Sequence, residues 1–118
     1  IGASFAGIFE GLVLAAKAGV KGETMFEVVR TSSVASPLFE IFTPLIMDRK
    51  FKGTGSQIAT MYKDLGITMS MAREEGATMF ATAAAFELFQ AGIARFPGED
   101  NQSIVKFLEE IAGTTVEW

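Results

Sequence analysis

The chain has 118 residues, a formal net charge of −4, no cysteine and no histidine. These numbers predict a single domain, and they exclude disulfides, thiolate chemistry, catalytic pairs that need histidine, and the usual zinc sites. The one basic cluster, at residues 48–52, is read as a solvated helix end, because nucleic-acid binding needs a broader basic surface. Apolar residues make up 49% and charged residues 20%. We therefore expect some apolar surface to be covered by something outside this chain.

Residues 1–18 are predicted to form a helix with two stripes. One stripe consists of larger apolar residues, namely Ile1, Phe5, Ile8, Phe9, Leu12 and Ala16. The other consists of small residues four positions apart, namely Ala3, Gly7, Gly11 and Ala15. A glycine inside a helix costs about 1 kcal/mol relative to alanine. We interpret Gly7 and Gly11 as points of close packing against another helix, from this chain or from a second subunit. The same spacing occurs in membrane helices, but Glu10 and Lys17 argue against that.

Two shorter helices are predicted next. Gly19 ends the first helix, and residues 23–31 form the second, with inward side chains Met25, Phe26, Val28 and Val29. Ser36 and Pro37 begin the third as N-cap and first helical residue. Pro44 is expected to kink this third helix or to split it.

The helix predicted over residues 56–75 carries apolar side chains on two faces. It follows a plain connector, FKGTG, and it is capped by Ser56 and ended by Gly76. One face has helical spacing, with Ile58, Met61, Tyr62, Leu65, Met69 and Ala72. The opposite face holds Thr60, Lys63, Asp64, Ile67 and Met71. A helix with two apolar faces is normally covered on both, so Lys63 and Asp64 either reach out at a rim or line a site.

The fifth predicted helix, residues 79–96, is apolar nearly all round and is expected to be the most buried element. Charged and polar residues in its middle make a core helix the better interpretation than a membrane span. Glu87 within it lies either at a rim or in an internal hydrogen bond.

Asn101 is predicted to cap the last helix, with Ile104, Phe107, Leu108 and Ile111 inward. Two acidic pairs, Glu74-Glu75 and Glu109-Glu110, are read as solvated helix faces. No stretch alternates as a strand would. The prediction is an all-α domain of about six helices that occupies residues 1–118.

Candidates for chemistry are few by residue type alone. Lys63 and Asp64 are neighbours on a helix, about 100° apart, and cannot face one another as a nucleophile and its base. From the residues alone, both can be surface charges or members of a site.

The segment Tyr62-Lys63-Asp64-Leu65-Gly66-Ile67, followed by an alanine-rich helix, resembles the β-hydroxyacid dehydrogenases. This family includes 3-hydroxyisobutyrate dehydrogenase, tartronate semialdehyde reductase and threonate dehydrogenase. The whole chain resembles their C-terminal helical domain, which is of the 6-phosphogluconate dehydrogenase type. Its start, IGASFAGIFEGLVLAAKAGV, is similar to the interdomain helix just after the Lys-x-x-x-Asn motif of the family. The segment GEDNQS at residues 98–103 resembles the glycine and Asp-x-Ser segment before their last helix.

The resemblance implies an oxidoreductase of two domains, with an N-terminal Rossmann domain outside this chain that binds NAD or NADP. Family members pass a hydride between a short 3-hydroxy acid and the cofactor. Their general acid/base lysine is expected just upstream of Ile1, so this fragment has no catalytic residue of its own and is expected to be inactive alone. We also expect a cytoplasmic homo-oligomer that binds neither membrane nor nucleic acid, with subunit packing that includes Gly7 and Gly11.

By the same resemblance, Lys63 and Asp64 are the cofactor-binding residues of this chain. Lys63 is expected in the cleft, near the cofactor or the substrate carboxylate, and Asp64 is expected to hold that geometry. Ser56 stands where many members have a phenylalanine that closes over the nicotinamide, which points to a polar sugar-acid substrate. The alternative is a non-catalytic helical oligomerisation or interaction module that shares only the packing pattern.

Overall fold

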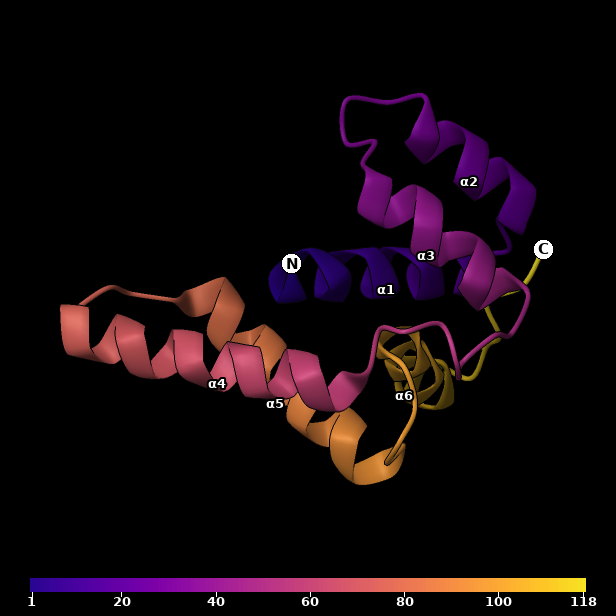
Figure 1. Cartoon of the computed structure of the whole chain (residues 1–118). Helices are drawn as coiled ribbons and strands as arrows, with labels where there is room; N and C mark the ends of the chain where they lie inside the picture. The colour runs from indigo at the N-terminus through magenta and orange to yellow at the C-terminus, as the bar shows by residue number, and fades with distance from the viewer.

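The computed structural model describes all of residues 1–118 and contains six α-helices and one short 3-10 helix (Figure 1). In chain order they are α1 (Gly2–Lys17), α2 (Gly22–Arg30), α3 (Pro37–Met47), α4 (Ile58–Glu75), α5 (Phe80–Arg95), η1 (Asn101–Ser103) and α6 (Ile104–Ala112). The only β-type pairing is an isolated bridge between Gln57 and Asp100. The predicted all-α fold of about six helices is confirmed.

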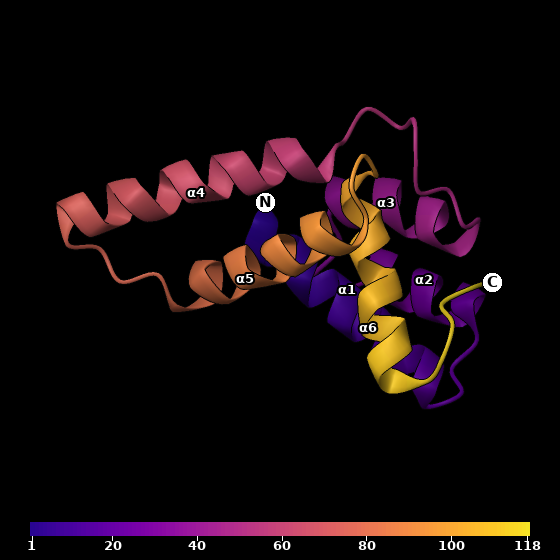
Figure 2. The same cartoon turned by 90° about the horizontal axis from the view of Figure 1, so that it is seen from below.

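The helices are arranged around α1. This helix packs against both α5 and α6, while α2 and α3 pack on one another and lie to one side of it (Figures 1 and 2). Helices α4 and α5 form a hairpin that projects away from the other helices in both views. The site-bearing helix α4 therefore lies at the outside of the domain, with α5 as its main neighbour.

The core lies where α1 meets α5 and α6. Phe5, Phe9 and Leu12 of α1 are buried there, together with Phe89 of α5 and Ile104 of α6. The rings of Phe5 and Phe9 stack with their centroids 5.3 Å apart. Each fully buried side chain of this size contributes roughly 1.5–3 kcal/mol. The apolar stripe predicted for the first helix is confirmed, apart from its first residue, Ile1, which is exposed.

The expectation that α5 is the most buried element is wrong. Only Ala85, Phe89 and Gly92 of this helix are buried, and Phe80 at its start is 87% exposed. Glu87 is also exposed, which places it at the rim. The hairpin geometry explains this, because α5 has neighbours on one side and open space on the other. The most buried stretch is instead the six consecutive residues 100–105.

Helices α5 and α6 come into close contact at Gly92. A Cβ at this position would lie 2.7 Å from Cγ1 of Ile104, closer than side chains tolerate. Glycine is therefore required where α5 crosses α6.

The start of α3 and the end of α4 are formed by the neighbouring residues that the sequence predicted. The hydroxyl of Ser36 accepts a hydrogen bond from the N–H of Phe39 at 3.2 Å, and Gly76 ends α4 with φ +72°. The caps predicted for Ser56 and Asn101 are wrong. Their side chains bond to one another instead, with Asn101 Nδ2 2.7 Å from Ser56 Oγ.

Helix α3 continues through Pro44 as one element. Proline has no N–H for the carbonyl of Glu40, one turn earlier, and Glu40 is exposed, so water can bond to that carbonyl. Of the two outcomes predicted for Pro44, a kink or a split, the split does not occur.

Glu109 is the clearest correction to the sequence prediction. It is only 6% exposed, whereas its neighbour Glu110 is exposed as predicted. Its carboxylate accepts two hydrogen bonds from the guanidinium of Arg49, at 2.6 and 3.0 Å, and one from the N–H of Val116 at 2.7 Å. Arg49 reaches it from a left-handed backbone conformation, with φ 58°. The tail that follows α6 therefore folds back and covers Glu109.

The end of this tail is also fixed. The indole N–H of Trp118 donates to Asp48 at 2.7 Å, and this hydrogen bond lowers the pKa of Asp48 below its ordinary value. A Cβ on Gly22 would lie 2.3 Å from the carbonyl oxygen of Glu117. The tail and the start of α2 are thus in backbone contact.

Candidate functional site

Lys63 and Asp64 lie in the middle of α4, and their side chains are 66% and 58% exposed. Lys63 Nζ lies 3.2 Å from Asp64 Oδ1. Although the helix sets the two Cα–Cβ bonds about 100° apart, the lysine side chain is long enough to reach its neighbour. The two side chains therefore form an ion pair, which does not test the prediction that they do not act as a nucleophile and its base. In water such an exposed pair contributes under about 1 kcal/mol, so its value to the protein is not stability.

The face of α4 next to Lys63 is apolar and open. Ile67 is 60% exposed and Met71 is 62% exposed. Together with Lys63, Gly66, Ser70 and Glu74 they line a shallow groove of ≈ 430 Å³. The second apolar face predicted for this helix exists, and no other helix of the chain covers it.

A second, smaller hollow of ≈ 180 Å³ lies at the start of α4. Its lining residues are Gly55, Ser56, Gln57, Thr60, Met61, Asp64 and Asn101. No side chain caps this helix end. Of the first-turn N–H groups, that of Ile58 bonds to the carbonyl of Glu99 at 3.1 Å, while those of Ala59 and Thr60 have no partner. Asp64 lines this hollow and pairs with Lys63, which lines the groove, so the ion pair joins a residue of the hollow to a residue of the groove.

The wall of the hollow is built by two loops that pair over a long sequence distance. The buried carboxylate of Asp100 accepts hydrogen bonds from the N–H and the hydroxyl of Thr54, at 2.7 and 2.8 Å. The N–H of Asn101 donates to the carbonyl of Ser56 at 2.7 Å. The connector FKGTG is therefore held at Thr54, and the residue that follows it, Ser56, is held as well. The sequence prediction missed Asp100, because a polar run between two helices looks like any exposed loop.

The outer side of the same loop pair is held by charge. Lys106 Nζ pairs with Glu99 and lies over the rings of Phe51 and Phe96, at 4.8 and 4.3 Å from their centroids. Partial burial raises the pKa of Glu99, but the hydrogen bond from Lys106 and its positive charge outweigh this, so the pKa lies below its ordinary value. Glu99 is thus a stable anion, and the loop that carries Asn101 is held at its base.

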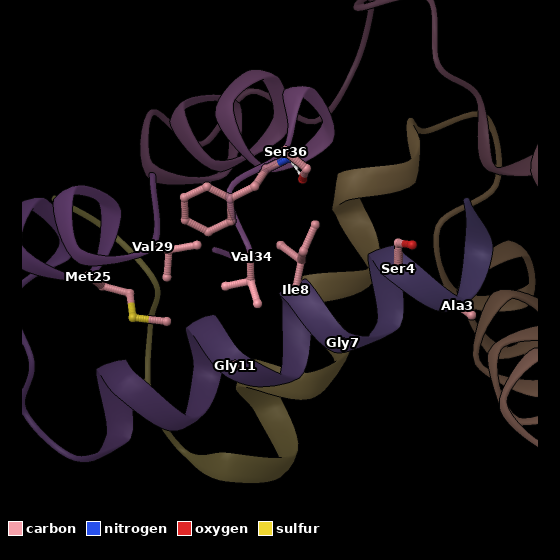
Figure 3. Close-up of a pocket in the computed structure, with 10 residues that line it drawn as sticks. Ala3, Ser4, Gly7, Ile8, Gly11, Met25, Val29, Val34 and Ser36 are labelled. Carbon is pink, nitrogen blue, oxygen red and sulfur yellow. Dashed lines mark hydrogen bonds between the residues drawn. The ribbon is translucent and has the colours of Figure 1, made fainter. Parts of the chain in front are cut away.

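The small-residue stripe of α1 faces an apolar groove of ≈ 420 Å³ (Figure 3). Figure 3 shows Met25, Val29 and Val34 along one side of the groove, with Gly7 and Gly11 on the bare ribbon of α1. A Cβ on either glycine would meet no atom within 4 Å. The close helix contact expected for these glycines is therefore not made within this chain.

No group of three or more acidic, histidine or cysteine side chains is placed to hold a metal ion. None of the helices combines the length and the apolar character that crossing a membrane requires.

Comparison with known proteins identifies the family. A family model described as "NAD-binding of NADP-dependent 3-hydroxyisobutyrate dehydrogenase" matches residues 1–108. The chain belongs to this family, the β-hydroxyacid dehydrogenases. The family assignment from the segment Tyr62–Ile67 is confirmed, and the family is one of NAD-dependent oxidoreductases.

Among β-hydroxyacid dehydrogenases, the 2-(hydroxymethyl)glutarate dehydrogenase of Eubacterium barkeri is 34% identical over 118 residues, which cover 98% of this chain and 39% of that protein. The L-threonate dehydrogenase of Cupriavidus necator is 28% identical over 111 residues, 93% of this chain and 37% of that protein. The crystal structure of 3-hydroxyisobutyrate dehydrogenase from Salmonella typhimurium matches with a TM-score of 0.83 and 25% identity, over 90% of this chain and 37% of that one. The chain thus spans well under half the length of these dehydrogenases.

Proposed function

We propose that this chain is the helical C-terminal domain of an NAD(P)-dependent dehydrogenase that passes a hydride between a short 3-hydroxy acid and the cofactor. The observation that carries the proposal is the open face of α4. Lys63, Ile67 and Met71 are exposed on one side of this helix, while the other side packs on α5. Family membership supports the reaction, and the open apolar face supports a second domain that covers it.

Within that enzyme, Lys63 supplies a cation at the closed cleft, where the cofactor and the substrate carboxylate both carry negative charge. Asp64 holds the ammonium group through the 3.2 Å ion pair. Ile67 and Met71 give the apolar contact that excludes water. NAD or NADP, when bound, supplies the hydride acceptor. In this chain, the Lys63 cation and the apolar side chains of Ile67 and Met71 fit the cofactor. They complement a glycine-rich phosphate site in a preceding domain and do not replace it.

In the full-length protein, the general acid/base lysine lies before Ile1. The 118 residues alone therefore bind and orient the substrate and the cofactor but do not catalyse hydride transfer. A cytoplasmic location belongs to the same proposal.

Replacing Lys63 with alanine in the full-length protein tests this role. We expect kcat/KM for a 3-hydroxy acid to fall by roughly 10- to 100-fold, because one charge that stabilises the transition state is removed. The melting temperature should stay unchanged, because the ion pair is exposed. Steady-state kinetics measure kcat/KM, and thermal unfolding measures the melting temperature.

Arg73→Ala is the matched control, since Arg73 is an exposed cation on the same helix. It should leave kcat/KM unchanged. Equal kinetics for Lys63→Ala and the wild type would remove Lys63 from the site. A full-length protein that reduces neither NAD nor NADP with any 3-hydroxy acid would contradict the proposed reaction itself.

We also propose that a second subunit occupies the α1 groove, and Gly7→Leu tests this. Because a Cβ at Gly7 meets nothing within 4 Å, the substitution should leave the folded monomer intact. Leucine is also the better helix former, by about 1 kcal/mol. The oligomer should nevertheless weaken, because the added side chain overfills a close intersubunit contact.

Light scattering after size exclusion measures this effect, with Ala84→Leu on the exposed side of α5 as the control. An unchanged oligomer in both variants would show that the groove is ordinary surface. The alternative function, a non-catalytic oligomerisation module, draws its support from the same groove. It predicts the same change in assembly without any hydride transfer.

A further inference from the structure

The C-terminal tail, residues 113–118, runs from the end of α6 back to α2. Gly113 turns the chain out of α6 with φ +66°. The last residues of the tail lie beside α2 in both views of the domain (Figures 1 and 2). The tail therefore crosses between two helices that are far apart in the sequence.

The centre of the tail is held firmly at Val116. This side chain is 1% exposed and belongs to the hydrophobic core. Its N–H donates to Glu109 at 2.7 Å, and its carbonyl accepts from Nη1 of Arg49 at 3.1 Å. These bonds join the tail to α6 and to the turn after α3. None of them involves α2, so this inner anchor does not depend on the position of α2.

The outer anchor of the tail is Trp118. Its indole N–H donates to Asp48 at 2.7 Å, at the end of α3. Its ring meets the ring of Phe26 in α2 edge-on, with the centroids 5.7 Å apart. Trp118 therefore ties α2 to the end of α3. Because Trp118 is 44% exposed, it can release with a smaller loss of burial than Val116.

Helix α2 has few other contacts that hold it. Gly22 is its only buried residue. A Cβ there would lie 2.3 Å from the carbonyl oxygen of Glu117, so the tail itself covers this residue. The other neighbours of α2 are α3 and, over a shorter contact, α1. Elements with few buried contacts open at a lower free energy than the whole domain unfolds. The position of α2 therefore depends on the tail.

Helix α2 also forms part of the wall of the α1 groove. Met25 and Val29 line that wall, opposite the bare stretch of α1 (Figure 3). Trp118 does not line the groove, but it contacts Phe26, the neighbour of Met25 in the sequence. Since a helix moves as a unit, a displacement of Phe26 also displaces the groove wall.

We propose that the C-terminal tail is a strap that sets the position of α2 and thereby the shape of the α1 groove. Release of Trp118 lets α2 move away from α1 and weakens binding in the groove. The effect on assembly rests on the proposed function, in which a second subunit occupies this groove. The effect on α2 does not.

Hydrogen exchange of the full-length protein, followed by mass spectrometry, tests the first step. Trp118→Ala removes one aromatic contact and one hydrogen bond. The amides of residues 22–30 should then exchange roughly tenfold faster or more. The amides of α5 should keep their rates, because Val116 still holds the tail to the core. Phe80→Ala removes an exposed ring and should leave the exchange of α2 unchanged.

Two further variants separate the contacts of Trp118. Trp118→Phe keeps a ring against Phe26 and loses the N–H, and Asp48→Ala removes only the acceptor. Each should speed exchange in α2 less than Trp118→Ala does, whereas a loss of global stability would speed exchange in α5 as well. Repeating the comparison in a Gly7→Leu background separates the release of α2 from a change in assembly. If Trp118→Ala does not fold, Trp118→Phe decides the exchange test.

Light scattering after size exclusion tests the second step. Trp118→Ala should shift the oligomer toward smaller species, although the residue lies outside the groove. Unchanged exchange in α2 would overturn the inference while the proposed function stands. Faster exchange without a change in assembly would refute the link between α2 and the groove if Gly7→Leu weakens the same oligomer. If Gly7→Leu has no effect either, the proposed subunit contact falls, and the exchange of α2 decides the role of the tail.

Discussion

Replacing Glu109 with alanine is expected to lower the free energy of unfolding by about 3 kcal/mol. The carboxylate accepts three hydrogen bonds, two from Arg49 and one from the N–H of Val116. Its removal leaves the buried N–H without a partner and the guanidinium without its counter-charge. Because Arg49 is 35% exposed, water recovers part of its solvation, and the loss stays at the lower end of the range for buried pairs.

Urea unfolding of the 118-residue chain, followed by circular dichroism, measures this loss. Glu110→Ala is a control one residue away. Glu110 pairs with Arg95 at the surface, with both side chains about half exposed, so its removal should cost less than about 1 kcal/mol. Equal stability of the two variants would show that Glu109 does not hold the C-terminal tail through Val116 in solution.

Replacing Phe89 with alanine is expected to cost about 4 kcal/mol, because a fully buried ring is lost and a cavity remains. Phe89 has no exposed surface, and its ring centroid lies 6.3 Å from that of Phe5 on α1. The contact joins α5 to the centre of the domain. Since domains are stable by only about 5–15 kcal/mol, this loss would remove between roughly a quarter and four-fifths of the total stability.

Phe80→Ala removes the same side chain from the same helix and is the matched control. Phe80 is 87% exposed, so we expect a change within about 0.5 kcal/mol in thermal or urea unfolding. A large loss at Phe80 would mean that α5 is covered on both sides, as its sequence suggested. The pair of variants therefore measures directly how one-sided the burial of α5 is.

The helices themselves were predictable because their signals are local. The fifth was predicted over 79–96 and runs from Phe80 to Arg95, and Ser36 caps α3 as its sequence position indicates. Local patterns fail where a polar side chain has a distant partner. Ser56 and Asn101 each have the composition of a cap, but they bond to one another across 45 positions. Glu109 fits a solvated face until the tail folds back over it.

In the candidate site, too, the sequence indicated what rests on local signals and missed what rests on distant partners. Lys63 and Asp64 became candidates because a short segment of α4 resembles the family and because two charges stand out on an apolar face. The hollow beside them was not found, since its wall depends on Asp100 reaching Thr54 from another loop. No spacing rule within a single helix contains that information.

The α4–α5 hairpin has one more consequence. Helix α1 reaches α4 at Leu65, where a Cβ on Gly2 would come within 2.8 Å of the leucine side chain. Beyond that point no third helix lies alongside the hairpin (Figures 1 and 2). Elements with one neighbour open locally at a lower free energy than the whole domain unfolds. The apolar surface of Ile67 and Met71 thus lies on a part of α4 that α5 alone supports, where local opening lets it adjust its shape to whatever closes over it.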